Sequence, residues 1–91
     1  MYFGLTNQFK KDLKKLKAEN NKLPFKVWEL IMSIEEEKDK TLQGIGKPEK
    51  LKGDLASCYS RRINQEHRLI YSYSSSYKVE LISCYGHYTN K

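Results

Sequence analysis

Three β-rich runs toward the C-terminal end constrain the fold of this chain more than any other feature. They are CYSRRIN (58–64), HRLIYSYS (67–74) and YKVELISCYGHY (77–88), and only the short turns QE and SS separate them. Aromatic and β-branched residues recur in all three runs, which favours strands, and connections this short can join only antiparallel neighbours. This part of the chain therefore predicts a three-stranded antiparallel meander.

The N-terminal part predicts a short strand followed by two amphipathic helices. MYFGL (1–5) alternates like a strand, and Thr6 can cap a helix that extends to about Glu19. Pro24 suits the first turn of a second helix, which the acidic run EEEKDK (35–40) closes. The apolar stripes that these helices bury are Phe9, Leu13 and Leu16 in the first, and Leu23, Val27, Leu30, Ile31 and Ile34 in the second, with Trp28 at its edge.

Together these elements predict an α+β fold with a single domain over residues 1–91. A chain of this length hides only about 60–65% of its extended surface and has no material for a second core. A helical hairpin also needs a sheet to cover its apolar side. We therefore expect the N-terminal strand and the three-stranded meander to form one twisted sheet packed against the two helices.

Charge and cysteine usage narrow the class of protein. Lysine and arginine number 17 against 11 acidic residues, so the net charge of +6 favours a polyanionic partner such as nucleic acid. No stretch approaches the ~18 apolar residues of a membrane span, and no secretory signal is recognisable, so we expect a cytoplasmic protein. Cys58 and Cys84 lack C-x-x-C spacing and a histidine pair, which favours two reduced strand residues over a metal or redox site.

The segment GIGKPEK contains the first candidate for acid–base chemistry. A nucleotide-binding loop needs a longer spacer between its glycines and Ser or Thr after its lysine, whereas Pro48 follows the lysine here. What remains is Glu49, which Pro48 stiffens. The lysines around it favour a charged carboxylate that can accept a proton, and the alternative is a solvated loop glutamate. These lysines are Lys47, Lys50 and Lys52.

The segment SRRINQEHRLIY places three arginines on the two arms of one hairpin. Adjacent strand residues point to opposite faces, so Arg61 and Arg62 cannot both face one site. A three-residue loop (64–66) sets Arg62 opposite Arg68, and an anion such as phosphate would suit the gap between two guanidiniums. A two-residue loop would instead set Arg62 opposite Leu69 and split the pair. The alternative role is ion pairing with the acidic run of the second helix.

His87 is the candidate proton donor. Strand alternation places it on the face of Leu81, and a bulge at Gly86 would turn it to the opposite face, so its side of the sheet stays open. A histidine with an ordinary pKa of about 6.5 can release a proton at cellular pH. Tyr88 offers a ring that could stack on a base. His67 is interpreted as a packing or hydrogen-bonding residue, and a lone, merely structural histidine is the alternative for His87.

These residues together match one reaction. Cleavage of RNA by its own 2′-hydroxyl needs a base to remove that proton, an acid to protonate the departing 5′-oxygen, and fixed positive charge for the pentacoordinate phosphate. Glu49, His87 and the Arg62–Arg68 pair can fill these three roles without a metal.

The stretch GIGKPEKLKGDLASCYSRRINQEHRLIYSY, followed by YGHY, resembles the YoeB/Txe family of toxins within the RelE/ParE superfamily. The blocks G-K-P-E-x-L-K, S-R-R-I, E-H-R-L-[VI]-Y and H-Y stand in the family's order over residues 44–88. The resemblance implies a RelE-like fold and a toxin of a type II toxin–antitoxin system. It also implies a ribosome-dependent endoribonuclease that cuts mRNA in the decoding site, leaves a 2′,3′-cyclic phosphate or 3′-phosphate and a 5′-hydroxyl, and inhibits translation.

The resemblance also assigns roles by position. Glu49 matches the general base, His87 the general acid, and Arg62 and Arg68 the phosphate-stabilising cations, while Tyr88 matches a residue that stacks on or orients a base. We expect a cognate antitoxin that is acidic and partly disordered, no cofactor and no metal, and homodimerisation is left open. Three residues, Thr89 to Lys91, follow the H-Y pair and depart from the family pattern. The residues expected to bind RNA are Lys47, Lys50, Lys52 and Arg61.

A rival hypothesis makes this chain a noncatalytic module. In that case the basic sheet docks on RNA or the ribosome, or the chain is a gyrase-poisoning toxin of the same fold, and His87 and Glu49 are only structural. Fold alone cannot separate these activities.

Overall fold

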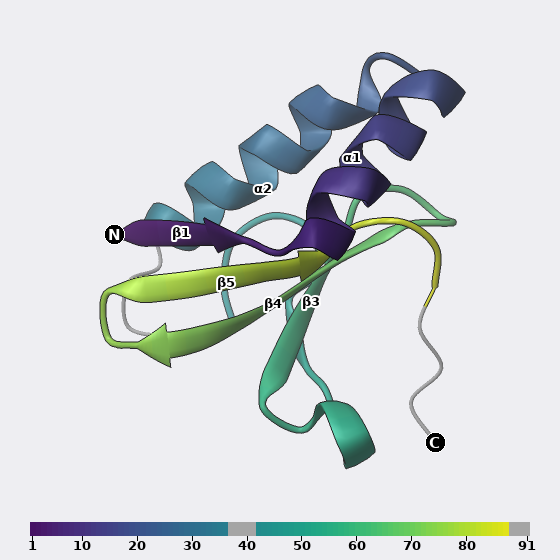
Figure 1. Cartoon of the computed structure of the whole chain (residues 1–91). Coiled ribbons are helices and arrows are strands. Elements are labelled where there is room, and N and C mark those ends of the chain that lie inside the picture. Colours follow the sequence, from purple (N-terminus) through teal and green to yellow (C-terminus); the bar gives the residue numbers. More distant parts are fainter. Residues whose placement is uncertain (37–41, 88–91) are drawn as a thin grey trace.

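The computed structural model describes residues 1–36 and 42–87 and confirms the predicted α+β class. Two helices and one five-stranded sheet follow in the predicted order (Figure 1). The elements are β1 (Tyr2–Leu5), α1 (Asn7–Glu19), α2 (Leu23–Glu36), β2 (Glu49–Lys50), a 3₁₀ turn (Gly53–Leu55), β3 (Cys58–Arg62), β4 (Arg68–Ser75) and β5 (Lys78–Ser83).

The sheet has the strand order β1-β5-β4-β3-β2. The predicted antiparallel meander is confirmed, since β4 pairs antiparallel with both β3 and β5. β1 joins it in parallel to β5, with Phe3 opposite Val79. Two details differ from the prediction. The short strand β2 was not expected, and β5 ends at Ser83 rather than continuing along the run 77–88, because the backbone turns at Gly86 (φ +83°).

The start of α1 fastens the helical layer to the sheet. As predicted, Thr6 caps the helix, its hydroxyl oxygen accepting from the amide of Phe9 at 3.0 Å. The same hydroxyl donates to the carbonyl of Ile82, near the end of β5, at 2.7 Å. A helix cap therefore doubles as a link between α1 and β5.

The two faces of the sheet differ. Both helices cover one face (Figure 1) and bury the main core against it, and this core includes Leu16, Leu30, Leu69 and Leu81. The other face carries a much smaller apolar cluster, which leaves its remaining area to polar side chains. The buried members of the small cluster are Leu51, Cys58 and Ile70, with Leu55 and Ile82 packed against them.

Other expectations from the sequence can be checked within residues 1–36 and 42–87. No helix there is long and apolar enough to cross a membrane. Cys58 and Cys84 are both free and buried, and Cys58 lies in β3 as predicted, whereas Cys84 follows the end of β5 and is not a strand residue. The acidic run EEEKDK lies partly outside the described residues.

Candidate active site

The hairpin between β3 and β4 pairs two of the predicted site arginines. Arg62 lies directly opposite Arg68, so the chain adopts the three-residue alternative for the loop. The amide of Ile63 donates to the carbonyl of His67 at 3.0 Å and closes the loop. The side chain of Asn64 accepts from the amides of Glu66 and His67, at 2.8 Å each, and orders it from inside.

Glu49 joins the two arginines on the face of the sheet that the helices leave open. In the short strand β2 it lies opposite Ser60 of β3. Directly opposite residues share a face, and so do residues two apart in one strand. Glu49, Ser60, Arg62 and Arg68 therefore face the same side, although they come from three strands.

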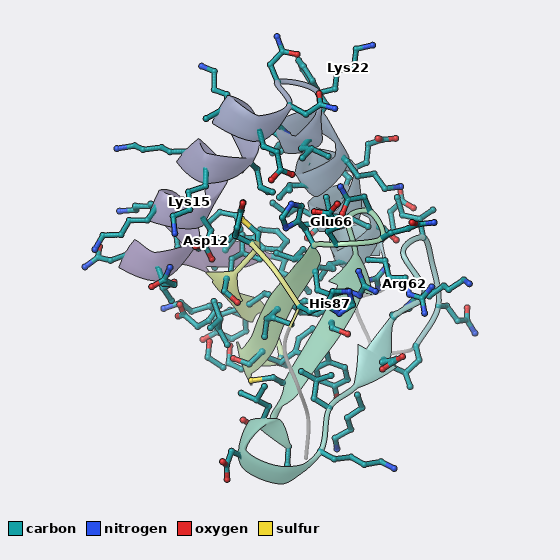
Figure 2. All side chains as sticks on the ribbon, turned by 90° about the vertical axis from the view of Figure 1, so that its right-hand side faces the viewer. Asp12, Lys15, Lys22, Arg62, Glu66 and His87 are labelled. Atoms are coloured by element: carbon teal, nitrogen blue, oxygen red, sulfur yellow. The ribbon has the colours of Figure 1, made fainter. Side chains whose placement is uncertain are left out.

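His87 leaves the alternation of β5 and turns to the loop between the two arginines. Its Nε2 donates to the carbonyl of Gln65 at 2.8 Å, while Nη1 of Arg68 donates to the neighbouring carbonyl of Asn64 at 2.7 Å. Two consecutive carbonyls thus hold the imidazole and one guanidinium at one end of the sheet. Figure 2 shows Arg62 and His87 on the side of the molecule that lies to the right in Figure 1. Tyr88 lies outside the described residues.

The prediction that Arg61 binds RNA is wrong, because this side chain is 0% exposed. Its Nε donates to the hydroxyl of Tyr71 at 2.9 Å, and Nη1 donates to the hydroxyl of Ser33 at 2.8 Å. The carbonyls of Ile45 and Gln43 accept the remaining bonds, at 3.0 Å each. Arg61 therefore joins β3, β4, α2 and the loop before β2, and sequence alternation alone could not tell which of the two adjacent arginines faces the core.

The glycines of GIGKPEK have a structural role at this clamp. Gly44 and Gly46 have φ values of +99° and +85°, which favour glycine. A Cβ at Gly44 would lie 2.8 Å from Nη1 of Arg61, and one at Gly46 would lie 2.6 Å from a methyl group of Leu30. The carbonyl of Gly46 also accepts from the amide of Arg62 at 2.7 Å. The loop that contains Gly44 and Gly46 thus packs against α2 and β3, and it leads directly into β2, where Glu49 lies at the edge of the sheet.

The three lysines of the predicted site are exposed on and around β2. Lys47 precedes the strand with a φ of +47°, Lys50 lies within it opposite Tyr59, and Lys52 follows it. They lie next to Glu49 in the chain and give this edge of the sheet a positive potential, although Lys50, opposite Tyr59, points from β2 to the other face than Glu49.

Sequence reasoning missed two acidic residues that hold the segment before His87. Asp12 is buried, and its Oδ2 accepts from the amide of Cys84 at 3.0 Å. Glu19 accepts from Nε2 of His67 at 2.6 Å and from the hydroxyl of Tyr85 at 3.0 Å. Both continue the spacing of the apolar stripe of α1, so a carboxylate at a stripe position was the signal that could have found them.

These contacts shift three pKa values. The hydrogen bonds from His67 and Tyr85 lower the pKa of Glu19, and the bond to Glu19 raises the pKa of Tyr85. Burial, and then the nearby Asp12, raise the pKa of the Cys84 thiol to about 12. Cys84 is therefore protonated at cellular pH and is not a nucleophile.

One cluster has the composition of a metal site but the wrong hydrogen bonds. The ligand atoms of Glu19, Glu66 and His67 lie within 4.8 Å of one another. However, Nδ1 of His67 accepts from the amide of Gly86 at 2.8 Å, so the ring carries its proton on Nε2. Nε2 is the nitrogen that faces Glu19, and a protonated nitrogen cannot coordinate a metal. This arrangement suits a hydrogen-bonding histidine, as the sequence predicted, and disfavours a cation.

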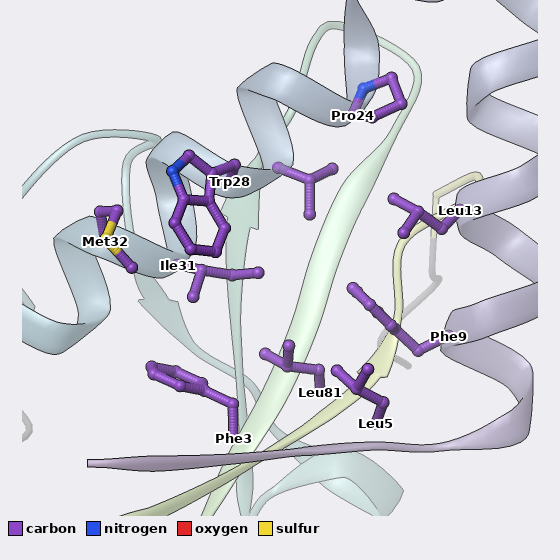
Figure 3. A pocket seen from close by; sticks show the side chains of 10 residues that line it. Phe3, Leu5, Phe9, Leu13, Pro24, Trp28, Ile31, Met32 and Leu81 are labelled. Carbon is purple, nitrogen blue, oxygen red and sulfur yellow. The ribbon is translucent and has the colours of Figure 1, made fainter.

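An apolar cavity of about 370 Å³ lies on the other side of the molecule, among α1, α2 and β1 (Figure 3). It contains no side chain that could act as an acid or a base, so it is not a candidate for the chemistry above. Its lining residues are Phe3, Leu5, Phe9, Leu13, Pro24, Val27, Trp28, Ile31, Met32 and Leu81.

Sequence comparisons point to one family. A family model described as a YoeB-like toxin of bacterial type II toxin-antitoxin systems matches residues 5–88. The toxin YoeB of Synechocystis sp. is 53% identical over 45 residues, which are 50% of this chain and 51% of that protein. The chain thus spans about half the length of the curated relatives it matches.

Solved structures match almost the whole chain. The YoeB/ParE toxin from Agrobacterium tumefaciens superposes with a TM-score of 0.85 at 35% identity, over 97% of this chain and 100% of that one. A YoeB dimer and a heterotetrameric YoeB-YefM complex, both from Staphylococcus aureus, give TM-scores of 0.82 and 0.81. Each is 40% identical over 97% of this chain and 98% of its own.

Proposed function

The chain belongs to the YoeB-like toxins of bacterial type II toxin-antitoxin systems, and on that premise we propose that it is a ribosome-dependent endoribonuclease. It cuts mRNA in the decoding site and so inhibits translation. The cut is a metal-independent acid–base reaction in which the 2′-hydroxyl of the RNA attacks the neighbouring phosphate, leaving a 2′,3′-cyclic phosphate and a 5′-hydroxyl.

The pairing of Arg62 with Arg68 is the observation that supports this proposal most directly. Two guanidiniums opposite each other repel unless an anion lies between them, and a scissile phosphate is such an anion. In this mechanism Glu49 removes the proton of the 2′-hydroxyl, the arginines stabilise the pentacoordinate phosphate, and His87 protonates the departing 5′-oxygen. The bond of His87 to a loop carbonyl is exchanged for one to the RNA as the substrate enters.

Further residues bind and orient the RNA. Lys47, Lys50 and Lys52, beside Glu49, attract the phosphate backbone and contribute a salt-dependent part of the affinity. Tyr88 stacks on a base next to the cut. Arg61 takes no part in binding, because its guanidinium is buried in the protein.

We further propose a cytoplasmic location, a cognate antitoxin as the protein partner, and homodimerisation. Solved structures of relatives from Staphylococcus aureus include a YoeB-YefM complex and a YoeB dimer. The net charge of +6 favours an acidic, partly disordered antitoxin that folds on the toxin and reaches or distorts the His87 region.

The test of activity uses a translating extract with a defined mRNA, and maps the 5′ ends of the fragments. The natural protein should cut in register with the reading frame and leave 5′-hydroxyl ends. Glu49→Gln and His87→Gln should bind ribosomes normally but cut roughly 10²- to 10⁴-fold more slowly. If both variants cut like the natural protein, the assignment of base and acid is wrong.

The same experiment addresses the rival hypothesis. Ribosome binding without cleavage by any form, including the natural protein, would support a noncatalytic module. Inhibition of DNA supercoiling without an effect on translation would support a gyrase-poisoning toxin. For the antitoxin, co-expression of an acidic antitoxin should restore growth of cells that produce this chain, and continued growth arrest despite a stable complex would contradict it.

A further inference from the structure

We propose that His67 is a positioning residue that holds the backbone of Gly86 and thereby sets the place of His87. The inference rests on the proposed function, because it assigns His67 a task in presenting the general acid. It is carried by hydrogen bonds around His67, which none of the catalytic roles above uses.

His67 connects three separate parts of the fold. Its Nδ1 accepts from the amide of Gly86 at 2.8 Å, and its Nε2 donates to Oε2 of Glu19, at the end of α1, at 2.6 Å. Its ring also packs on that of Tyr85, with 4.4 Å between the ring centres. His67 as a residue is only 2% exposed, so water has little access to its ring nitrogens, while the carboxylate of Glu19 stays partly exposed.

Glu19 determines which ring nitrogen of His67 carries the proton. A carboxylate accepts and does not donate, so it stabilises the proton on Nε2 and leaves Nδ1 as the acceptor. The hydroxyl of Tyr85 donates to the other oxygen of Glu19 at 3.0 Å, which fixes the carboxylate. Glu19, at the end of α1, therefore keeps Nδ1 of His67 able to accept the hydrogen bond from Gly86.

The segment before His87 is held by backbone hydrogen bonds at Cys84 and at Gly86. Asp12 accepts from the amide of Cys84, His67 accepts from the amide of Gly86, and the amide of Arg68 donates to the carbonyl of Gly86 at 3.1 Å. Gly86 itself has a φ of +83°, a conformation that needs such support. Because His87 is the next residue, a loss of the bond to His67 moves the imidazole relative to Arg68.

Two substitutions separate the two bonds of His67. In His67→Asn the amide oxygen stands at the position of Nδ1, so the acceptor for Gly86 is kept and the donor to Glu19 is lost. In His67→Gln the amide nitrogen stands at the position of Nε2, so the donor to Glu19 is kept and the acceptor for Gly86 is lost. A comparison of the two variants therefore shows which of the two hydrogen bonds positions His87.

We expect His67→Gln to lower the single-turnover cleavage rate on ribosomes at least tenfold with unchanged ribosome affinity, and His67→Asn to retain most of the rate. Ile34→Val in α2 serves as a control for a general loss of stability. Amide hydrogen exchange gives a readout independent of activity: Gly86 should stay protected in the natural protein and in His67→Asn, and lose protection in His67→Gln.

Three outcomes would contradict the role of His67 or the proposed function separately. If the cleavage rates of both His67 variants follow their thermal stability, as for Ile34→Val, His67 is merely structural. If Gly86 is equally protected in both variants, the bond is not the means of positioning. If the natural protein does not cut RNA but Gly86 loses protection only in His67→Gln, the proposed function is wrong while the positioning by His67 stands.

Discussion

Two adjacent arginines have opposite environments in this molecule. Arg61 is buried and bonded to four protein oxygens, whereas Arg62 is exposed opposite Arg68. Both carry the same charge in the same strand, so only the face on which each lies distinguishes them. The same arginine-to-lysine substitution can therefore test the structural role of Arg61 and the proposed catalytic role of Arg62.

Arg61→Lys should destabilise the fold, and Arg62→Lys should not. A lysine at position 61 cannot reproduce the planar fork and leaves buried acceptors unpaired, at a cost of about 3 kcal/mol in the free energy of unfolding. Arg62→Lys should change that free energy by less than about 0.5 kcal/mol and reduce cleavage. Urea unfolding and a cleavage assay on both variants check this, and equal destabilisation by the two would contradict the assignment.

The buried thiol of Cys84 should lower the stability of the fold at alkaline pH. The pKa of the Cys84 thiol is raised to about 12 by burial, whereas an unfolded cysteine ionises near about pH 8.5. Between these values the unfolded chain releases a proton that the folded chain keeps, so the free energy of unfolding falls as the pH rises, by at most about 1.4 kcal/mol per pH unit.

The test compares Cys84→Ala with the natural protein. Urea unfolding at about pH 9 and about pH 11 should give a smaller loss of stability for the variant than for the natural protein. Cys58→Ala is the matched control, since it removes the other buried thiol and leaves Cys84 in place. An equal loss in all three proteins would show that Cys84 does not contribute.

The pairing of Arg62 with Arg68 was one of two alternatives that the sequence offered, and the three-residue loop selects it. The roles proposed for the carboxylate, the guanidiniums and the imidazole rest on residue type. The mistake at Arg61 arose because period-two alternation says that neighbours face opposite sides but not which side is covered by helices. The contacts of Asp12, Glu19 and His67 join residues tens of positions apart, and no local pattern predicts such pairs.

At the scale of elements, the helices and the three-stranded meander were predictable because their periodicities are long and regular. β2 was missed because it has only two residues, Glu49–Lys50, which no pattern can distinguish from a loop. The end of β5 was predicted too late, because the run of β-forming residues continues past Ser83 while the glycine that turns the backbone lies within it.

Gly86→Ala should affect the site more than the fold. The φ of +83° disfavours any residue with a Cβ, by about 1–2 kcal/mol, yet an added Cβ would meet nothing within 4 Å. The strain is therefore relieved by rotation of the backbone, which displaces His87. We expect a loss of about 1 kcal/mol in the free energy of unfolding and a cleavage rate reduced more than tenfold.

Gly86→Asn provides the control for this prediction. Asparagine tolerates positive φ better than alanine does, so this variant should cut faster than Gly86→Ala. Single-turnover cleavage and urea unfolding of both variants check the order. If alanine and asparagine reduce cleavage equally, the effect does not come from backbone strain.

At the scale of the whole molecule, the excess of positive charge is spread over separate surfaces. Exposed lysines follow α1, and others lie beside Glu49 at the far edge of the sheet. Only the second group lies next to the proposed path of the RNA. Matched pairs of lysines can therefore separate specific contacts from general attraction by the net charge.

The double variant Lys47→Gln/Lys50→Gln should weaken the salt dependence of RNA binding. Two contacts to single-stranded phosphates correspond to a slope of log affinity against log salt that is smaller by about 1.4. Lys10→Gln/Lys14→Gln removes the same charge from α1 and should change the slope much less. Titration of a short RNA at several salt concentrations measures both, and equal changes would indicate nonspecific attraction.

The parallel pairing of β1 with β5 has a consequence for how the molecule is made. The hydroxyl of Thr6 donates to the carbonyl of Ile82 across 76 positions of the chain, so the earliest strand completes its contacts only with the latest. Topologies rich in such distant contacts fold slowly, in roughly milliseconds to seconds. During synthesis the first strand leaves the exit tunnel long before its neighbour does. The sheet therefore cannot be completed until β5 has left the ribosome, so the segment that carries His87 takes its place only at the end of synthesis.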